Sequence, residues 1–273
     1  MEEIVYLCLF AFLAGFIDSV VGGGGLIQVP ALFIFLPGVP VATIFGTGKL
    51  ASIAGTTSAM VKYVRSVKIN YLAILPAAVA AFICSFLGAR ALSHFDANLA
   101  RPLILILLVL VAVYTFIKKD FGSMHAPKLT DAKEKFYGLL MGMIIGFYDG
   151  FFGPGTGSFL IFIFIGIYGF NFLAASAAAK VVNVATNLSA LLYFIYKGHV
   201  LYEVAIPMAV CSIIGSQLGT RTALKRGTGF VRALFLVVVS GIIVKFGYDT
   251  YGTGGKDFEA ISSAVLEWVG RKG

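Results

Sequence analysis

The chain has 273 residues, of which 59% are hydrophobic and 12% are charged, and its formal net charge at pH 7 is +8. A soluble globular domain carries about twice that share of charge, so the composition excludes both a soluble globule and a disordered chain. It predicts an all-α polytopic membrane protein. The basic residues fall in short loops between apolar runs, as the positive-inside rule requires, so we expect a lipid bilayer and not a nucleic acid as partner.

The first half of the chain predicts a broken first helix followed by three longer spans. Two glutamates, and no basic residues, precede the apolar run at 4–21, so we expect a retained membrane span and not a secretory signal. Glycines at 22–25 interrupt this run, and a short run at 26–36 follows. Three further runs of about 20 residues, a length that spans about 30 Å of hydrocarbon as α-helix, occupy residues 41–61, 69–92 and 99–117.

The second half repeats this order at a constant offset of 131 residues. Of the 105 residue pairs that this offset aligns from position 15 onward, 25 are identical. The offset aligns Asp18 with Asp149 and Lys49 with Lys180. A similar distribution of hydrophobic residues in the two halves would not by itself align charged residues that are rare in apolar segments. The runs of the second half lie at 136–152, 158–169, 172–196, 200–220 and 230–245, with a glycine-rich break at 153–157.

The duplication divides the chain into two homologous membrane repeats, at about residues 4–119 and 136–250. We assign residues 1–119 to the first transmembrane repeat, 120–135 to a basic polar linker and 136–250 to the second transmembrane repeat. Residues 251–273 form a C-terminal tail with no counterpart in the first half. Its apolar residues fall on one helical face, which is typical of an interfacial amphipathic helix, and a contact helix or an expression remnant are the alternatives.

The path of the chain at the two breaks decides how the repeats are oriented. If the chain turns back there, each repeat has five membrane segments and the repeats are inverted; if it continues across, each has four and they are parallel. The first arrangement puts 12 basic loop residues on one side and 3 on the other, against 9 and 6 for the second. The positive-inside rule therefore favours inverted repeats within a range of eight to ten segments.

Asp18 and Asp149 each lie four residues before the first glycine of a break. An ionised carboxylate in hydrocarbon is costly, so such a residue faces a partner or a cavity and marks a functional site by default. Two roles stay open, and they are compatible. The carboxylates either accept N–H groups of the broken backbone, or act in coupling and gating by carrying a proton.

The breaks are candidate anion sites. Irregular backbone at membrane depth is tolerated only where it is buried in protein or lines a water-filled cavity. A half-helix that begins there presents free N–H groups and the positive end of its dipole, which suits an anion. Close helix packing through small residues is the alternative explanation. The candidate binding residues are Gly24 and Gly25 in the first break and Gly155, Thr156 and Gly157 in the second.

Lys49 and Lys180 form the second matched pair of charges inside apolar runs. We interpret each as a cation that holds an anionic substrate or pairs with Asp18 or Asp149, with snorkelling to the interface as the alternative. Polar residues follow three and seven positions later on the same helix face: Ser52 and Thr56 after Lys49, and Asn183 and Asn187 after Lys180. This stripe predicts a polar surface at the repeat interface, either for substrate or for helix–helix hydrogen bonds.

Other chemistry finds little support in the sequence. The cysteines at 8, 84 and 211 lie in apolar runs without metal or disulfide spacing, so we interpret them as packing residues. The histidines at 94, 125 and 199 are scattered in loop-like places, and residues 46–49 miss the phosphate-loop pattern. We therefore expect no enzyme activity, no cofactor and no bound metal.

These motifs resemble those of the TauE/SafE family of sulfite exporter-like membrane proteins. The resemblance covers about residues 4–250 and rests on the segments 15–25 and 146–157, on Lys49 and Lys180 with Asn183, and on 88–90 and 219–221. It implies export or uptake of small anions, such as sulfite, organosulfonates, related sulfur oxyanions or organic acids. The chain departs from the family pattern at Ser19, where Gly is usual, and at Gly153-Pro154-Gly155-Thr156, where a pure glycine run is usual.

The preferred hypothesis is a secondary transporter of a small anion that works by alternating access about a site at the repeat interface, with a proton as the candidate coupling ion. The sequence contains no ATPase motif, so an ion gradient or the substrate gradient must drive transport. A passive anion channel on the same scaffold is the alternative, and a non-transporting membrane partner is a third hypothesis. We expect a multi-pass protein of a prokaryotic cell membrane, and a homo-oligomer stays open.

Overall fold

The computed structural model describes residues 2–36, 38–68, 71–93, 129 and 131–251. The predicted all-α class is confirmed, since the described residues form helices and no strand. The run predicted at 99–117, most of the linker, the tail beyond residue 251 and the histidines at 94 and 125 lie outside the described residues. The helices are α1 (Glu2–Val21), α2 (Gly25–Phe35), α3 (Val41–Ser66), α4 (Tyr71–Leu92), α6 (Asp131–Phe151), α7 (Thr156–Gly166), α8 (Phe172–Tyr196) and α9 (Tyr202–Tyr251).

Both helix breaks lie at the predicted glycines. α1 ends at Val21 and α6 ends at Phe151, and a half-length helix begins a few residues after each. Gly22 has a φ of +74° and Gly153 a φ of +88°, a backbone conformation that residues with a Cβ rarely adopt. The glycines therefore stop one helix and start the next at these points.

The first residues of corresponding helices keep the offset of 131 positions. This offset separates Gly25 from Thr156 and Val41 from Phe172. In the second half α9 consists of two helical parts in succession, and Gly227, with φ 74° and ψ −169°, interrupts the helix between them. The sequence predicted two separate runs here, at 200–220 and 230–245, and the backbone break at Gly227 lies between them.

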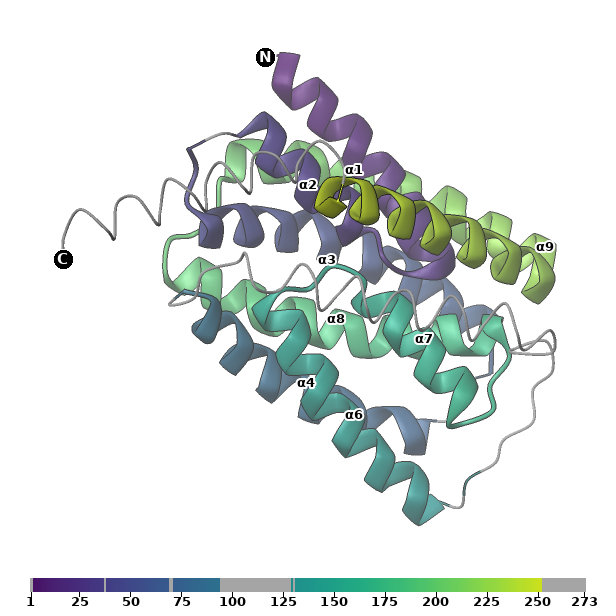
Figure 1. Ribbon diagram of the computed structural model, residues 1–273. Coiled ribbons are helices and arrows are strands. Elements are labelled where there is room, and N and C mark those ends of the chain that lie inside the picture. Colours follow the sequence, from purple (N-terminus) through teal and green to yellow (C-terminus); the bar gives the residue numbers. More distant parts are fainter. Residues whose placement is uncertain (1, 37, 69–70, 94–128, 130, 252–273) are drawn as a thin grey trace.

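Two pairs of helices pack closely through small residues. α1 lies along α9, and α6 lies along α4, with α3 and α8 between the two pairs (Figure 1). A Cβ atom added to Gly215 of α9 would overlap the carbonyl oxygen of Phe12, and one added to Gly150 of α6 would overlap that of Ser85. Such close approach between membrane helices depends on residues without bulky side chains. On the α1–α9 interface Cys8 also contacts Cys211, and both are free thiols.

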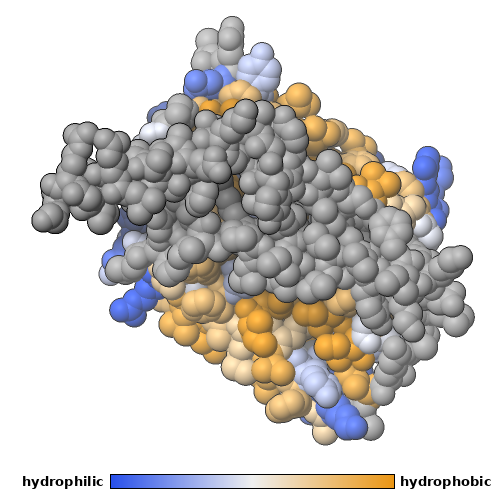
Figure 2. Space-filling view, in the orientation of Figure 1, coloured by the Kyte–Doolittle hydropathy of each residue, from blue (hydrophilic) through white to orange (hydrophobic). Residues whose placement is uncertain are grey.

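The described helices suit a multi-pass membrane protein. Four of them are long and apolar enough to cross a membrane, over Glu3–Val21, Ile74–Leu92, Phe172–Tyr196 and Tyr202–Gly227. Large apolar side chains on the outer face of α4, such as Leu75, Val79 and Ile83, are more than half exposed, and Figure 2 shows a broad apolar surface over the α4 and α6 region. An exposed apolar surface of this kind fits contact with lipid. At 11 residues each, α2 and α7 are too short to span the hydrocarbon alone.

Candidate functional site

Two buried ion pairs connect the first half of the chain with the second. The Nζ atom of Lys49 on α3 lies 2.7 Å from Oδ2 of Asp149 on α6. The Nζ atom of Lys180 on α8 lies 2.8 Å from Oδ2 of Asp18 on α1. Each lysine thus pairs with the carboxylate of the other half, a pairing that the sequence left open.

Both ammonium groups lie inside the protein. Lys180 is fully buried and Lys49 nearly so. The snorkelling alternative is therefore wrong for both residues, because neither side chain reaches the surface. Buried charges of this kind persist only when they are paired and hydrogen-bonded.

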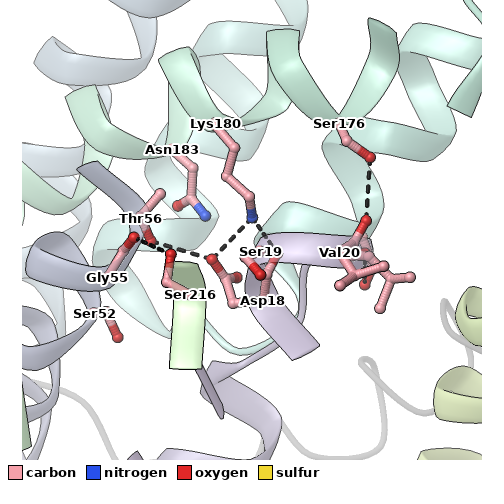
Figure 3. Close-up of polar contacts among 12 residues, drawn as sticks. Asp18, Ser19, Val20, Ser52, Gly55, Thr56, Ser176, Lys180, Asn183 and Ser216 are labelled. Carbon is pink, nitrogen blue, oxygen red and sulfur yellow. Dashed lines mark hydrogen bonds and ion pairs between the residues drawn. The ribbon is translucent and has the colours of Figure 1, made fainter. Parts of the chain in front are cut away.

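The carboxylates accept hydrogen bonds from side chains of other helices. Thr56 donates to Oδ2 of Asp18 at 3.2 Å, and Lys180 donates both to this atom and to the main-chain carbonyl of Asp18 (Figure 3). Lys49 donates to Oδ2 of Asp149. Within the described part of the chain, neither carboxylate accepts an N–H group from a break, so the structure does not support that predicted role.

The two breaks touch each other at the centre of the protein. A Cβ atom added to Gly22 would overlap the backbone of Gly157, and one added to Gly25 would lie 3.3 Å from the Cα of Pro154. Ser158 also donates to the main-chain carbonyl of Val21 at 3.2 Å. The irregular segments are therefore packed against one another, and residues 137 positions apart in the sequence meet there.

A cavity of about 50 Å³ lies beside this contact. Its volume suits a few water molecules or a solute of similar size. The glycines of both breaks form part of its wall, and Phe45 and Phe152 form an apolar part. The polar side chains that line it are Asp18, Gln28, Lys49, Ser52, Thr56, Asp149, Thr156, Asn183, Asn187 and Ser212.

The structure brings nearly all of the predicted site residues to this one cavity. Lys180 is the exception, because it lies behind Asp18 and does not line the space. Figure 3 shows Lys180 and Asn183 descending from α8 toward Asp18 and Thr56. The predicted residues that line the cavity are Asp18, Gly24, Gly25, Lys49, Ser52, Thr56, Asp149, Gly155, Thr156, Gly157, Asn183 and Asn187.

Gln28 and Ser212 also line the cavity, and the sequence analysis missed both. Nε2 of Gln28 donates to the carbonyl oxygen of Gly48 at 2.9 Å, and its Oε1 lies 3.4 Å from the hydroxyl of Ser52. Gln28 and Ser212 are each a polar residue within an otherwise apolar run, which is a signal that the sequence does contain. The comparison of the two halves does not reveal them, because Phe159 and Ala81 occupy the matching positions in the other half.

The cavity presents hydrogen-bond donors of several kinds. The N–H groups of Gly24, Gly25 and Gly157 have no hydrogen-bond acceptor among the described residues. They lie at the N-terminal ends of α2 and α7, where the helix dipole is positive. Together with the Lys49 ammonium and the side-chain amides, these groups suit the oxygens of a small oxyanion.

The arrangement offers no evident metal-binding set. Over the described ranges, no three His, Cys, Asp or Glu side chains lie close enough together to hold a metal ion. The charged side chains that line the cavity are Lys49, Asp18 and Asp149. Lys49 compensates the charge of Asp149, and Lys180, which does not line the cavity, compensates that of Asp18.

Known proteins give this chain a family context. The family model described as Sulfite exporter TauE/SafE matches residues 7–246. The probable membrane transporter protein YfcA of Escherichia coli strain K12 is 33% identical over 269 residues, which cover 97% of this chain and 93% of that protein. A probable membrane transporter protein of Haemophilus influenzae is 32% identical over 255 residues, which cover 91% of this chain and 96% of that protein. No solved structure matches the chain.

Proposed function

Because the chain belongs to the sulfite exporter TauE/SafE family of membrane transporters, we propose that it is a secondary transporter of a small anion and that the cavity between the two glycine breaks is its binding site. The observation that carries this proposal is the polar, partly cationic cavity enclosed by two broken helices. Sulfite, an organosulfonate, a related sulfur oxyanion or an organic acid is the expected substrate. The cell membrane is the expected location.

The binding chemistry follows from the donors on the wall. The ammonium of Lys49 supplies the positive charge, and the N–H groups of Gly24, Gly25 and Gly157 supply directed hydrogen bonds. Hydrogen bonds to an ionised acceptor are roughly twice as strong as those between neutral groups. A compact oxyanion with several oxygens matches such a set of convergent donors.

Alternating access is supported by the crossing of α3 and α8. These two helices occupy equivalent positions in the two halves of the chain. Residues with higher numbers in α3 contact residues with lower numbers in α8 and in the turn after it. The two helices are therefore antiparallel, which is what inverted repeats require. The contacts are Thr43 with His199, Gly46 with Phe194, and Thr56 with Lys180 through Asp18.

Coupling to protons is supported by the two ion pairs. Lys49 is held by Asp149 at 2.7 Å, so an anion must compete with this carboxylate for the same ammonium. Protonation of a carboxylate in the site removes a negative charge and favours the anion by electrostatics. The ion pairs therefore give the transporter a way to link anion binding to proton binding.

The test is transport by the purified protein in liposomes. Uptake of labelled sulfite, sulfoacetate and taurine should include at least one solute that saturates and shows counterflow, the behaviour of a carrier. Lys49→Ala should abolish most of that uptake, whereas Lys197→Ala, at an exposed lysine after α8, should leave it unchanged. Uptake that never saturates and carries current would favour the passive channel, and equal rates for wild type and Lys49→Ala would contradict the proposed site.

A further inference from the structure

The two ion pairs present opposite charges to the cavity. In the first pair the Lys49 side chain is 8% exposed and Asp149 is 2% exposed, so the cation is the more accessible partner. In the second pair Lys180 is 0% exposed and Asp18 is 17% exposed, so the carboxylate is the more accessible partner. The more accessible partner is thus the Lys49 ammonium in one pair and the Asp18 carboxylate in the other, and Asp149 also lines the cavity.

The four charges sum to zero, which constrains what the site accepts. Two lysines and two aspartates form the pairs, and no other charged side chain of the described residues lines the cavity. A monoanion that enters alone adds one uncompensated negative charge to a buried site. Such a charge is strongly disfavoured unless a cation accompanies it.

Asp18 is the carboxylate best placed to take that cation as a proton. It is the more exposed carboxylate, and it accepts from Lys180 of α8 and Thr56 of α3. If Asp18 becomes neutral, Lys180 still donates to the main-chain carbonyl of Asp18, so the buried ammonium keeps an acceptor. Asp149 offers Lys49 no such second acceptor among the described contacts.

Few other ionisable groups surround Asp18. α3 contributes Lys49 across the cavity and the buried Tyr63, whose hydroxyl donates to the carbonyl of Ser19 at 3.0 Å. α6 contributes Asp149, already paired with Lys49. The residues of α2, α7 and α9 that line the cavity carry no ionisable side chain. Asp18 and Lys180 are therefore the local pair that responds to a proton entering the cavity.

We propose that the site loads an anion together with enough protons to leave the occupied site without net charge, that Asp18 holds the proton, and that Lys49 meets the anion. This inference rests on the proposed function and adds to it the residue that holds the proton, the number of protons per anion and the separate roles of the two ion pairs. For a monoanion the stoichiometry is one proton.

Transport should respond to the pH gradient and not to the membrane potential. With one proton per anion, each pH unit by which the outside is more acidic than the inside gives about a tenfold higher anion concentration inside. If the loaded site is electroneutral, the membrane potential does not change the accumulation ratio of the anion. For an anion that moves alone, 100 mV would change this ratio about 50-fold. By linkage, anion binding and proton binding strengthen each other, so anion affinity rises as pH falls.

The probe is methanesulfonate, a strong-acid monoanion that carries no proton of its own, so any coupled proton must sit on the protein. In liposomes we expect uptake that follows the pH gradient and does not change when valinomycin and potassium set the potential. In detergent, binding to the wild type should take up one proton per anion from a weakly buffered solution.

Variants separate the residues. Asp18→Asn should bind methanesulfonate without proton uptake and transport it with current. Infrared difference spectra should show a protonated carboxyl band on binding, which Asp18→Glu shifts and Asp149→Glu leaves in place. Because Asp18→Asn leaves the buried Lys180 without its counter-charge, its melting temperature is measured first, and Asp18→Glu supplies the answer if the asparagine variant unfolds.

Three results would each contradict a different part of these proposals. Methanesulfonate uptake that carries current in the wild type overturns the inference and leaves the proposed function standing. A carboxyl band that shifts in Asp149→Glu and not in Asp18→Glu overturns the assignment to Asp18. If the wild type transports none of methanesulfonate, sulfite, sulfoacetate or taurine, the proposed function fails and this inference fails with it.

Discussion

The two glycine breaks occupy equivalent positions in the chain, yet the protein stabilises them in different ways. The first break has four consecutive glycines, and the carbonyls just before it are held by hydroxyl groups of Tyr63, Ser158 and Ser176 from other helices. The second break is held largely by its own segment: Thr156 donates to the carbonyl of Gly153 at 2.7 Å, and Tyr148 donates to that of Pro154 at 2.6 Å. The first break therefore depends on tertiary contacts and the second on local ones.

The ion pairs differ in the same manner. Lys180 has two acceptors, both on Asp18, and no exposure to the cavity. Lys49 has one described acceptor and reaches the cavity wall. Lys180 is thus enclosed by the protein, and the Lys49 ammonium lies where a solute in the cavity can contact it.

The largest effect is expected from Lys180→Met, which leaves the partly buried Asp18 without its counter-charge. Removal of one partner of a buried pair costs about 3–5 kcal/mol of folding stability. Denaturant unfolding in detergent measures this loss, and the double variant Asp18→Asn with Lys180→Met should recover much of it. A double variant no more stable than Lys180→Met alone would contradict the pairing of Lys180 with Asp18.

Gly22→Ala comes next, because it strains the contact between the breaks. The left-handed φ costs about 1–2 kcal/mol for a residue with a Cβ, and overlap with Gly157 adds about 1–3 kcal/mol. Gly38→Ala is the matched control, since Gly38 has a φ of +85° and open space around it. Thermal unfolding should therefore show a larger loss for Gly22→Ala, and equal losses would mean that the two breaks do not touch.

Lys49→Ala should weaken anion binding, and it also leaves the buried Asp149 without its counter-charge. A hydrogen bond to a charged group contributes about 1.5–3 kcal/mol, so the affinity for the transported anion should fall at least tenfold. Titration of the purified variant with that anion, followed by its melting temperature, measures the change. Unchanged affinity in a folded variant would remove Lys49 from the site.

The smallest effects test how each break is held. Tyr63→Phe and Tyr148→Phe each remove one hydroxyl donor to a main-chain carbonyl, at a cost of about 1 kcal/mol. Hydrogen exchange should become faster at residues 19–25 in the first variant and at residues 153–159 in the second. Faster exchange at both breaks in either variant would show that they open together.

The sequence allowed much of the site to be predicted, because the chain contains its own comparison. The offset of 131 residues singled out Asp18, Asp149, Lys49 and Lys180 as charges that apolar segments retain twice. The same comparison hid Gln28 and Ser212, since each occurs in only one repeat. Repetition in a sequence reveals the residues that both halves share, and it does not reveal the residues in which the halves differ.

By itself the sequence determined the membrane class, the duplicated helix order and the positions of both breaks, because hydropathy, glycine conformation and charge cost are properties of local segments. Only the tertiary structure decided that each lysine pairs with the aspartate of the other half, that the breaks touch, and that Lys180 is sealed while Lys49 faces the cavity. Those facts depend on how the helices cross, and the crossing is set by packing between residues 100 or more positions apart.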